Sequence, residues 1–125
     1  MEQKYFECKV CGNIVAMVKE SGPKVMCCGQ KMEKIEAGTV EASREKHIPV
    51  VARNGNTLEV VVGSVDHPMI DVHYIEWISV QTNLGNQIKN LSPNEAPKAK
   101  FELLENEVVE AVYAYCNLHG LWKAE

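Results

Sequence analysis

The sequence predicts an all-β protein in which a small metal-binding module precedes a β-sandwich. Two observations carry this prediction. Short runs rich in Val, Ile, Tyr and Trp recur between turn sequences over residues 48–115. Four of the five cysteines lie before Gly29, whereas all four histidines follow Thr39. The first four cysteines and the four histidines therefore fall in separate domains, which we place at residues 1–37 and 38–125.

The N-terminal module is too small to fold on a hydrophobic core alone, because about 40 residues is the usual lower limit. Residues 4–7 and 14–19 have the composition of short strands, and Ser21-Gly22-Pro23 forms a turn after them. Five cysteines are an odd number, and two are adjacent, so a disulfide framework would leave one thiol unpaired. A reducing compartment with cysteines as metal ligands is the better explanation.

The larger domain contains the strand-like runs, at residues 48–52, 58–62, 74–81, 87–91, 99–104 and 108–115. Turn sequences separate them, at residues 54–56, 83–86 and 92–94, with the Gly, Asn and Pro that tight connections need. Residues 102–112 also have acidic residues that would suit one face of a helix, but their β-branched and aromatic neighbours favour a strand. Six or seven short strands indicate immunoglobulin-like architecture.

The first candidate site combines Cys8 and Cys11, in a C-x2-C-G turn, with the adjacent pair Cys27 and Cys28. Two-residue spacing lets both sulfurs of the first pair reach one metal. Adjacent side chains of extended backbone point to opposite faces, so the chain must bend at the second pair. Four thiolates fit iron or zinc, and the spacing leaves both a structural zinc and a redox iron open.

The second candidate site consists of the remaining cysteine and the histidines, which all lie in loops or at strand ends, where binding groups usually occur. These residues are His47, His67, His73, Cys116 and His119. Singly, each histidine is more often a surface or hydrogen-bonded residue, but Cys116 and His119 have metal-ligand spacing of their own. Five ligands indicate octahedral iron with one open position, where a small anion can bind.

Glu45 and Lys46 directly precede His47 and are candidates for the open side of that site. Lys46 would raise the local potential for anions, and Glu45 could enter as a carboxylate ligand. A solvated charge pair is the alternative.

Composition and charge argue against a nucleic-acid-binding protein and against a membrane protein. The net charge of -4 and the scattered basic residues argue against nucleic-acid binding. No apolar run reaches the ~18 residues of a membrane span, and the first residues do not resemble a secretory signal. We therefore expect a cytoplasmic protein without membrane or nucleic-acid partners.

Together these motifs resemble desulfoferrodoxin, the two-iron superoxide reductase, over essentially the whole chain. The residues that carry the resemblance are Cys8-x2-Cys11, Cys27-Cys28, Glu45-Lys46-His47-Ile48-Pro49, His67-Pro68-Met69, His73-Tyr74-Ile75-Glu76-Trp77 and Cys116-Asn117-Leu118-His119-Gly120-Leu121-Trp122. The resemblance implies a desulforedoxin-like domain with a rubredoxin-type Fe(Cys)4 centre, an immunoglobulin-like domain with an Fe(His)4(Cys) centre, and a homodimer. His47, His67, His73 and His119 would be equatorial ligands, and Cys116 the axial thiolate.

The resemblance also implies the reaction. Superoxide would bind the open position of ferrous iron and be reduced by one electron to hydrogen peroxide, and a rubredoxin-like donor would restore the ferrous state. Lys46 matches the lysine that attracts superoxide, and Glu45 the carboxylate that closes the open position of the ferric state. A non-enzymatic electron carrier and a zinc-ribbon interaction module are the alternatives. The role of the first iron, as electron relay or structural support, stays open.

Overall fold

The computed structural model describes residues 2–125 and divides the chain into two compact units, Met1–Glu36 and Ala37–Glu125. We name them the N-terminal unit and the C-terminal unit. Nearly all regular structure is β-strand, as the sequence predicts. The described part of the chain contains one helix, α1 (Arg44–His47), and no helix with the length and apolar character of a membrane span.

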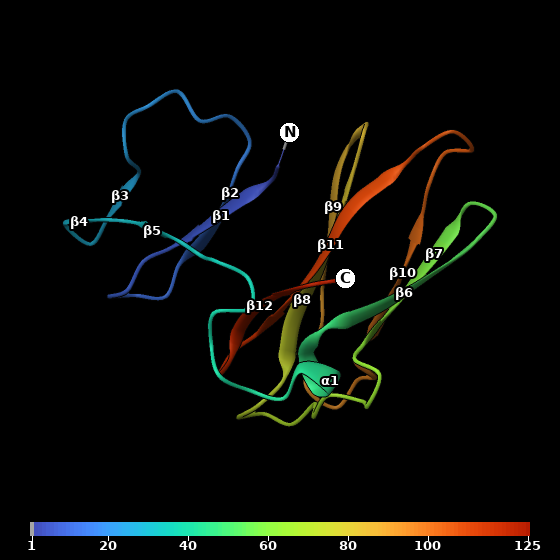
Figure 1. The fold of residues 1–125 in the computed structure, drawn as a ribbon. Coiled ribbons are helices and arrows are strands. Elements are labelled where there is room, and N and C mark those ends of the chain that lie inside the picture. The colour runs from blue at the N-terminus through green and yellow to red at the C-terminus, as the bar shows by residue number, and fades with distance from the viewer. Residues whose placement is uncertain (1) are drawn as a thin grey trace. The chain divides into compact units, whose positions relative to one another are not determined.

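The N-terminal unit is built on an antiparallel sheet with the order β2-β1-β5. Its strands are β1 (Lys4–Glu7), β2 (Ile14–Met17) and β5 (Glu33–Lys34), and a second ribbon pairs β3 (Met26–Cys27) with β4 (Gln30–Lys31). The blue and cyan part of Figure 1 shows these short strands connected by longer loops. Among its described residues, Phe6, Cys8 and Met32 form a small buried cluster. A core this small agrees with the expectation that the unit needs a metal for stability.

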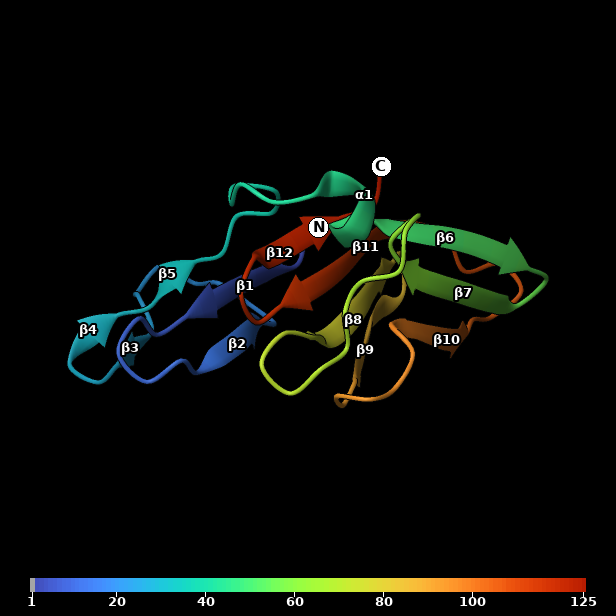
Figure 2. The ribbon, with the colours of Figure 1, turned by 90° about the horizontal axis from the view of Figure 1, so that it is seen from below.

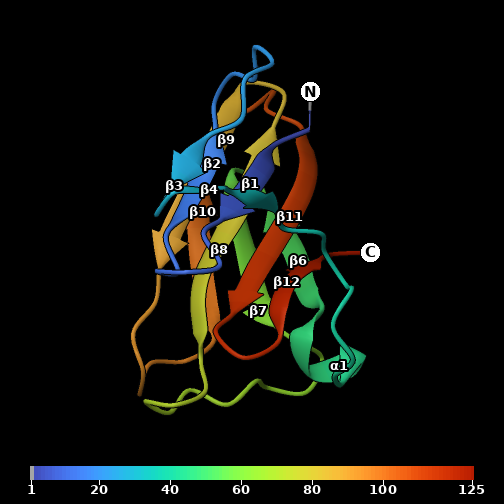
Figure 3. The ribbon, with the colours of Figure 1, turned by 90° about the vertical axis from the view of Figure 1, so that its left-hand side faces the viewer.

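The C-terminal unit is a sandwich of two antiparallel sheets, with the orders β10-β7-β6 and β12-β11-β8-β9. The strands are β6 (Pro49–Asn54), β7 (Thr57–Val62), β8 (Ile75–Thr82), β9 (Gly85–Asn90), β10 (Lys98–Glu102), β11 (Val109–Cys116) and β12 (Gly120–Lys123). Figure 3 shows the sheet that contains β8 and β11 in front of the strands β6 and β7. This arrangement confirms the predicted fold class.

Alternation of side chains explains why these strands form a sandwich. Along β7, Leu58, Val60 and Val62 point inward and are at most 1% exposed, while the residues between them are partly exposed. They pack against buried residues of the facing sheet, such as Ile78 and Val112. Burial of one face of each sheet supplies the main driving force for this fold.

In the C-terminal unit, two elements differ from the strand runs seen in the sequence. Residues 44–47 form the one-turn helix α1, which stands at the start of β6 (Figure 2). The strand β12 follows the last long run and pairs with β11 from Tyr113↔Lys123 to Cys116↔Gly120. Its four residues are too few for a clear alternation pattern, so sequence reasoning missed this strand.

Candidate metal centres

The first group of metal-binding residues lies at the turn after β1. The amide of Gly12 donates to the Cys8 carbonyl at 2.9 Å, and Gly12 has a φ of 85°, which a glycine adopts without strain. This turn brings Cys11 back over Cys8, so that the Cys11 amide donates to the Cys8 sulfur at 3.4 Å. The C-x2-C-G sequence therefore forms a turn that presents two sulfurs to one point.

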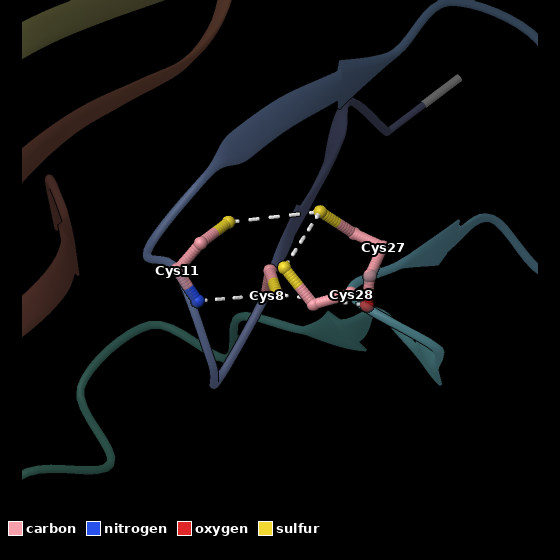
Figure 4. Close-up of side chains that lie close together, drawn as sticks. All are labelled: Cys8, Cys11, Cys27 and Cys28. Atoms are coloured by element: carbon pink, nitrogen blue, oxygen red, sulfur yellow. Dashed lines mark hydrogen bonds between the residues drawn. The ribbon is translucent and has the colours of Figure 1, made fainter.

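The adjacent cysteines reach the same point through a sharp bend between β3 and β4. Cys28 and Gly29 both have left-handed backbone, with φ values of 52° and 73°. The sulfurs of Cys27 and Cys28 are 4.0 Å apart, and Cys27 lies 3.6 Å from the Cys11 sulfur (Figure 4). Metal–sulfur bonds of about 2.3 Å place tetrahedral sulfurs about 3.8 Å apart, so the four residues fit one ion.

The charges at this group also favour a cation. The hydrogen bond from the Cys11 amide lowers the pKa of the Cys8 thiol to about 6. Conversely, neighbouring thiols, first that of Cys11, raise the pKa of Cys28 to about 12. One thiolate thus forms readily while the crowding of sulfurs opposes further charge. A bound metal ion removes that repulsion.

The second group lies where α1 and the loops after β7 and β11 meet the start of β8. His47 Nδ1 lies 2.6 Å from the Ser43 carbonyl oxygen, and His67 Nδ1 lies 2.7 Å from that of Pro68. Because a carbonyl accepts, each Nδ1 is the protonated nitrogen and each Nε2 has a free lone pair. The two Nε2 atoms are nevertheless 3.1 Å apart. Two lone pairs this close repel each other, and a cation near both would remove the repulsion.

The remaining ligands complete this second group. The ligand atoms of His47, His67, His73 and Cys116 all lie within 4.8 Å of one another. His119 joins them through Nδ1, which is 3.2 Å from His47 Nε2 and 3.9 Å from the Cys116 sulfur. Adjacent ligands of an octahedral ion with bonds of about 2.1 Å are about 3.0 Å apart, which matches the nitrogen separations.

Burial supports a metal here as well. His73 Nε2 is buried without a hydrogen-bond partner among the described residues. Desolvation lowers the pKa of His67 to about 4 and that of His47 below its usual value, so both imidazoles stay neutral, the form that binds metals. Burial raises the pKa of the Cys116 thiol, whereas the amides of Leu118 and His119 oppose that effect.

Two side chains that sequence reasoning did not assign support the ligands. The Trp122 ring stacks on His47 with a centroid distance of 4.9 Å, and its Nε1 donates to the His119 carbonyl at 3.0 Å. Asn117 accepts from the Tyr74 amide and donates to the Val72 carbonyl, which ties the 116–119 turn to the segment beside His73. Both residues lie inside the motifs quoted above, but their partners are distant in sequence.

Glu45 and Lys46 lie on α1, directly before His47, with exposed side chains. Desolvation is the main cause that lowers the pKa of His73, followed by the charge of His119 and then by that of Lys46. The ammonium group therefore acts electrostatically on the second group.

The two donor sets match different iron centres. Four cysteines form a closed sulfur shell of the rubredoxin type, whereas four imidazoles and one thiolate leave an octahedral ion one free position. These sets agree with the two iron cofactors that the sequence predicts.

Comparison with known proteins agrees with this geometry. The family model described as desulfoferrodoxin matches residues 39–125, and the model of the desulfoferrodoxin N-terminal domain matches residues 1–35. A desulfoferrodoxin homolog from Archaeoglobus fulgidus is 45% identical over 119 residues, which cover 95% of this chain and 94% of that protein. Desulfoferrodoxin from Nitratidesulfovibrio vulgaris is 41% identical over 99% of this chain and 97% of its own length.

A solved structure gives the same result for the fold. The superoxide reductase from Treponema pallidum is 38% identical, with a TM-score of 0.85 and full coverage of both chains. Family models, relatives and fold therefore agree that this chain belongs to the desulfoferrodoxin family.

Proposed function

We propose that this protein is a superoxide reductase, which removes superoxide by one-electron reduction to hydrogen peroxide at the second centre. The observation that carries this proposal is the convergence of four imidazoles and one thiolate, which leaves a position for a small ligand. The solved relative from Treponema pallidum is itself a superoxide reductase. The balanced reaction consumes one superoxide, one electron and two protons for each hydrogen peroxide.

In this proposal, His47, His67, His73, Cys116 and His119 hold the second iron, and Cys8, Cys11, Cys27 and Cys28 hold the first. When bound, ferrous iron at the second centre supplies the electron and a coordination position for the substrate. The buried Cys116 thiolate donates charge to the metal. The loop hydrogen bonds of His47 and His67 fix both rings before any metal binds.

Glu45 and Lys46 act on the substrate side. Lys46 attracts the superoxide anion and provides a hydrogen-bond donor near the reacting oxygen, in line with its electrostatic effect on His73. The Glu45 carboxylate would be available to close the open position of the ferric centre. Both groups are exposed and can therefore reach solvent protons.

A rubredoxin-like protein is the proposed electron donor, and we propose a cytoplasmic homodimer as the working form. The first centre is accessory, because a closed sulfur shell passes electrons but binds no substrate.

A non-enzymatic electron carrier, with the first centre as its working site, is the second candidate. The exposure of Cys11 and Cys28 favours it, since electrons pass most easily to a centre near the surface. In that case the histidines would be structural or bind zinc.

Metal analysis and product stoichiometry separate the two candidates. We expect two irons per chain, a visible spectrum with contributions from both centres, and one hydrogen peroxide for each superoxide consumed after a radiolysis pulse. Release of dioxygen would indicate dismutation instead. Zinc at the second site, or no reaction with superoxide, would refute the proposed function.

A further inference from the structure

Gly63 lies in unusually close contact with the turn that carries His47. A Cβ atom at Gly63 would be 2.5 Å from the Glu45 carbonyl oxygen, 3.0 Å from the Ile48 oxygen and 3.0 Å from the Lys46 carbonyl carbon. All three are backbone atoms of α1 and its cap, so no flexible side chain can move aside. A side chain at Gly63 would therefore push the whole turn away.

Gly63 differs from the other glycines of the chain in what surrounds it. Seven of the eight glycines have left-handed φ values, but Gly63 does not, and it is the one glycine at which an added Cβ would lie within 3.0 Å of another atom. The close approach to the α1 turn is therefore the feature that distinguishes Gly63 from the other glycines.

Hydrogen bonds join the same two segments. The Val65 amide donates to the Glu45 carbonyl oxygen at 3.0 Å, and the Ser64 hydroxyl donates to that oxygen at 3.2 Å. Residues 63–65 thus pack against the α1 turn through the close approach of Gly63 and through these two hydrogen bonds. We call this arrangement the backbone clamp.

The backbone clamp connects two ligands of the second centre. Residues 63–65 lead directly to His67, whose amide donates to the Val62 carbonyl at 2.9 Å, and the α1 turn ends at His47. The two Nε2 atoms are 3.1 Å apart. Movement of either segment by a few tenths of an ångström changes that separation.

We propose that Gly63 is a positioning residue of the second centre, because its lack of a side chain allows the backbone clamp to set His47 against His67 before the metal binds. The inference depends on the iron centre of the family and not on superoxide as substrate. Glu45 and Lys46 lie on the same turn, so under the proposed function the backbone clamp positions them too.

The variant Gly63→Ala tests this role through metal binding. In anaerobic titrations with ferrous iron, we expect the affinity of the second centre to fall roughly 10–100-fold, as for other residues that orient ligands. We also expect its ferric absorption band to shift. The first centre lies in the other unit, so its unchanged spectrum serves as an internal reference.

Val80→Ala is the matched control, because Val80 is a fully buried core residue of β8 and is not part of the backbone clamp. It should lower the melting temperature and leave the second centre's affinity and spectrum unchanged. Wild-type affinity and spectrum in Gly63→Ala would overturn the proposal. An equal loss of affinity in Val80→Ala would also overturn it.

Hydrogen exchange keeps the test independent of how well Gly63→Ala folds. In metal-free wild-type protein, the Val65 amide should be protected, and Ser64→Ala should increase its exchange rate. Exchange of the Val65 amide at the unprotected rate would show that the clamp forms only with metal and would refute the inference. Failure of the wild type to reduce superoxide would refute the proposed function and leave these measurements valid.

Discussion

At the scale of single residues, the second centre is defined by which nitrogen of each imidazole faces inward. His47 and His67 each use Nδ1 for a carbonyl, whereas His119 presents Nδ1 to the group. His73 Nε2 is buried without a hydrogen-bond partner in the described part of the chain, which costs about 1–3 kcal/mol when nothing compensates it. Coordination of a metal by this nitrogen removes that cost. Metal binding is therefore expected to stabilise the folded site.

Lys46 provides a prediction at this scale. Lys46→Ala should lower the bimolecular rate with superoxide roughly three- to tenfold, because one positive charge near the open position is lost. Raising the ionic strength should slow the wild type more than the variant. Pulse radiolysis measures both rates.

Arg44→Ala is the matched control for Lys46→Ala, since Arg44 lies on the same turn but its guanidinium pairs with Glu125 at 2.8 Å. Its rate should stay close to that of the wild type. If Lys46→Ala reacts as fast as the wild type at low salt, Lys46 has no part in substrate attraction.

At the scale of elements, strand ends and the connections between them place the functional groups. β11 ends at Cys116, and the turn to β12 places His119 while Gly120, with a φ of 77°, closes it. The connection between β10 and β11 is held differently. The Glu107 carboxylate there accepts from the Thr82 hydroxyl and from the Leu104 amide.

This connection predicts a pH dependence. The Thr82 hydrogen bond, followed by the Leu104 amide, lowers the pKa of Glu107 below its ordinary value of 4.5. The unfolded chain therefore binds the proton more readily, and Glu107 stabilises the fold fully above pH 4.5. That contribution is lost as the pH falls through the lower, folded-state pKa.

Glu107→Gln should therefore be less stable than the wild type at neutral pH, and the difference should shrink in acid. Urea unfolding of the C-terminal unit at several pH values measures it. Glu105→Gln, at an exposed carboxylate of the same connection, should show no such trend. A stability difference that is constant with pH would contradict the assigned role of the Glu107 carboxylate.

At the scale of the whole molecule, the two units differ in the size of their buried cores. The N-terminal unit has three residues in its buried cluster, whereas the core of the C-terminal unit has eleven. A small unit with few buried residues obtains much of its folding free energy from metal binding. Under the proposed function, we expect the C-terminal unit to need its metal for reaction more than for folding.

Loss of the first iron tests this division. Cys28→Ser should reduce the iron content from two to one per chain and unfold the N-terminal unit, while superoxide reduction by the pre-reduced protein stays within about twofold of the wild type. Iron analysis, circular dichroism and pulse radiolysis measure these effects. His67→Ala should do the reverse, with the sulfur-centre spectrum kept and the reaction lost. A large loss of the superoxide reaction in Cys28→Ser would assign an essential role to the first centre.

Much of this protein was predictable from the sequence because its signals are local. Strand composition and turn residues predicted the all-β fold, and C-x2-C spacing with an adjacent cysteine pair predicted the sulfur centre. The histidines became a convincing set only together with Cys116 and the resemblance to desulfoferrodoxin. These predictions needed residue types and spacings, and no distances between remote segments.

Only the tertiary structure decided how the second centre is held, because its supports join residues far apart in the chain. Trp122 stacks on His47 across 75 positions, and Gly63 contacts a turn that begins nearly twenty residues before it. A glycine in the sequence indicates backbone freedom, whereas Gly63 is needed for a close contact that no local pattern encodes. The sequence by itself identified the candidate metal-binding residues, and the packing of distant segments determined which of their atoms face one another and where those atoms lie.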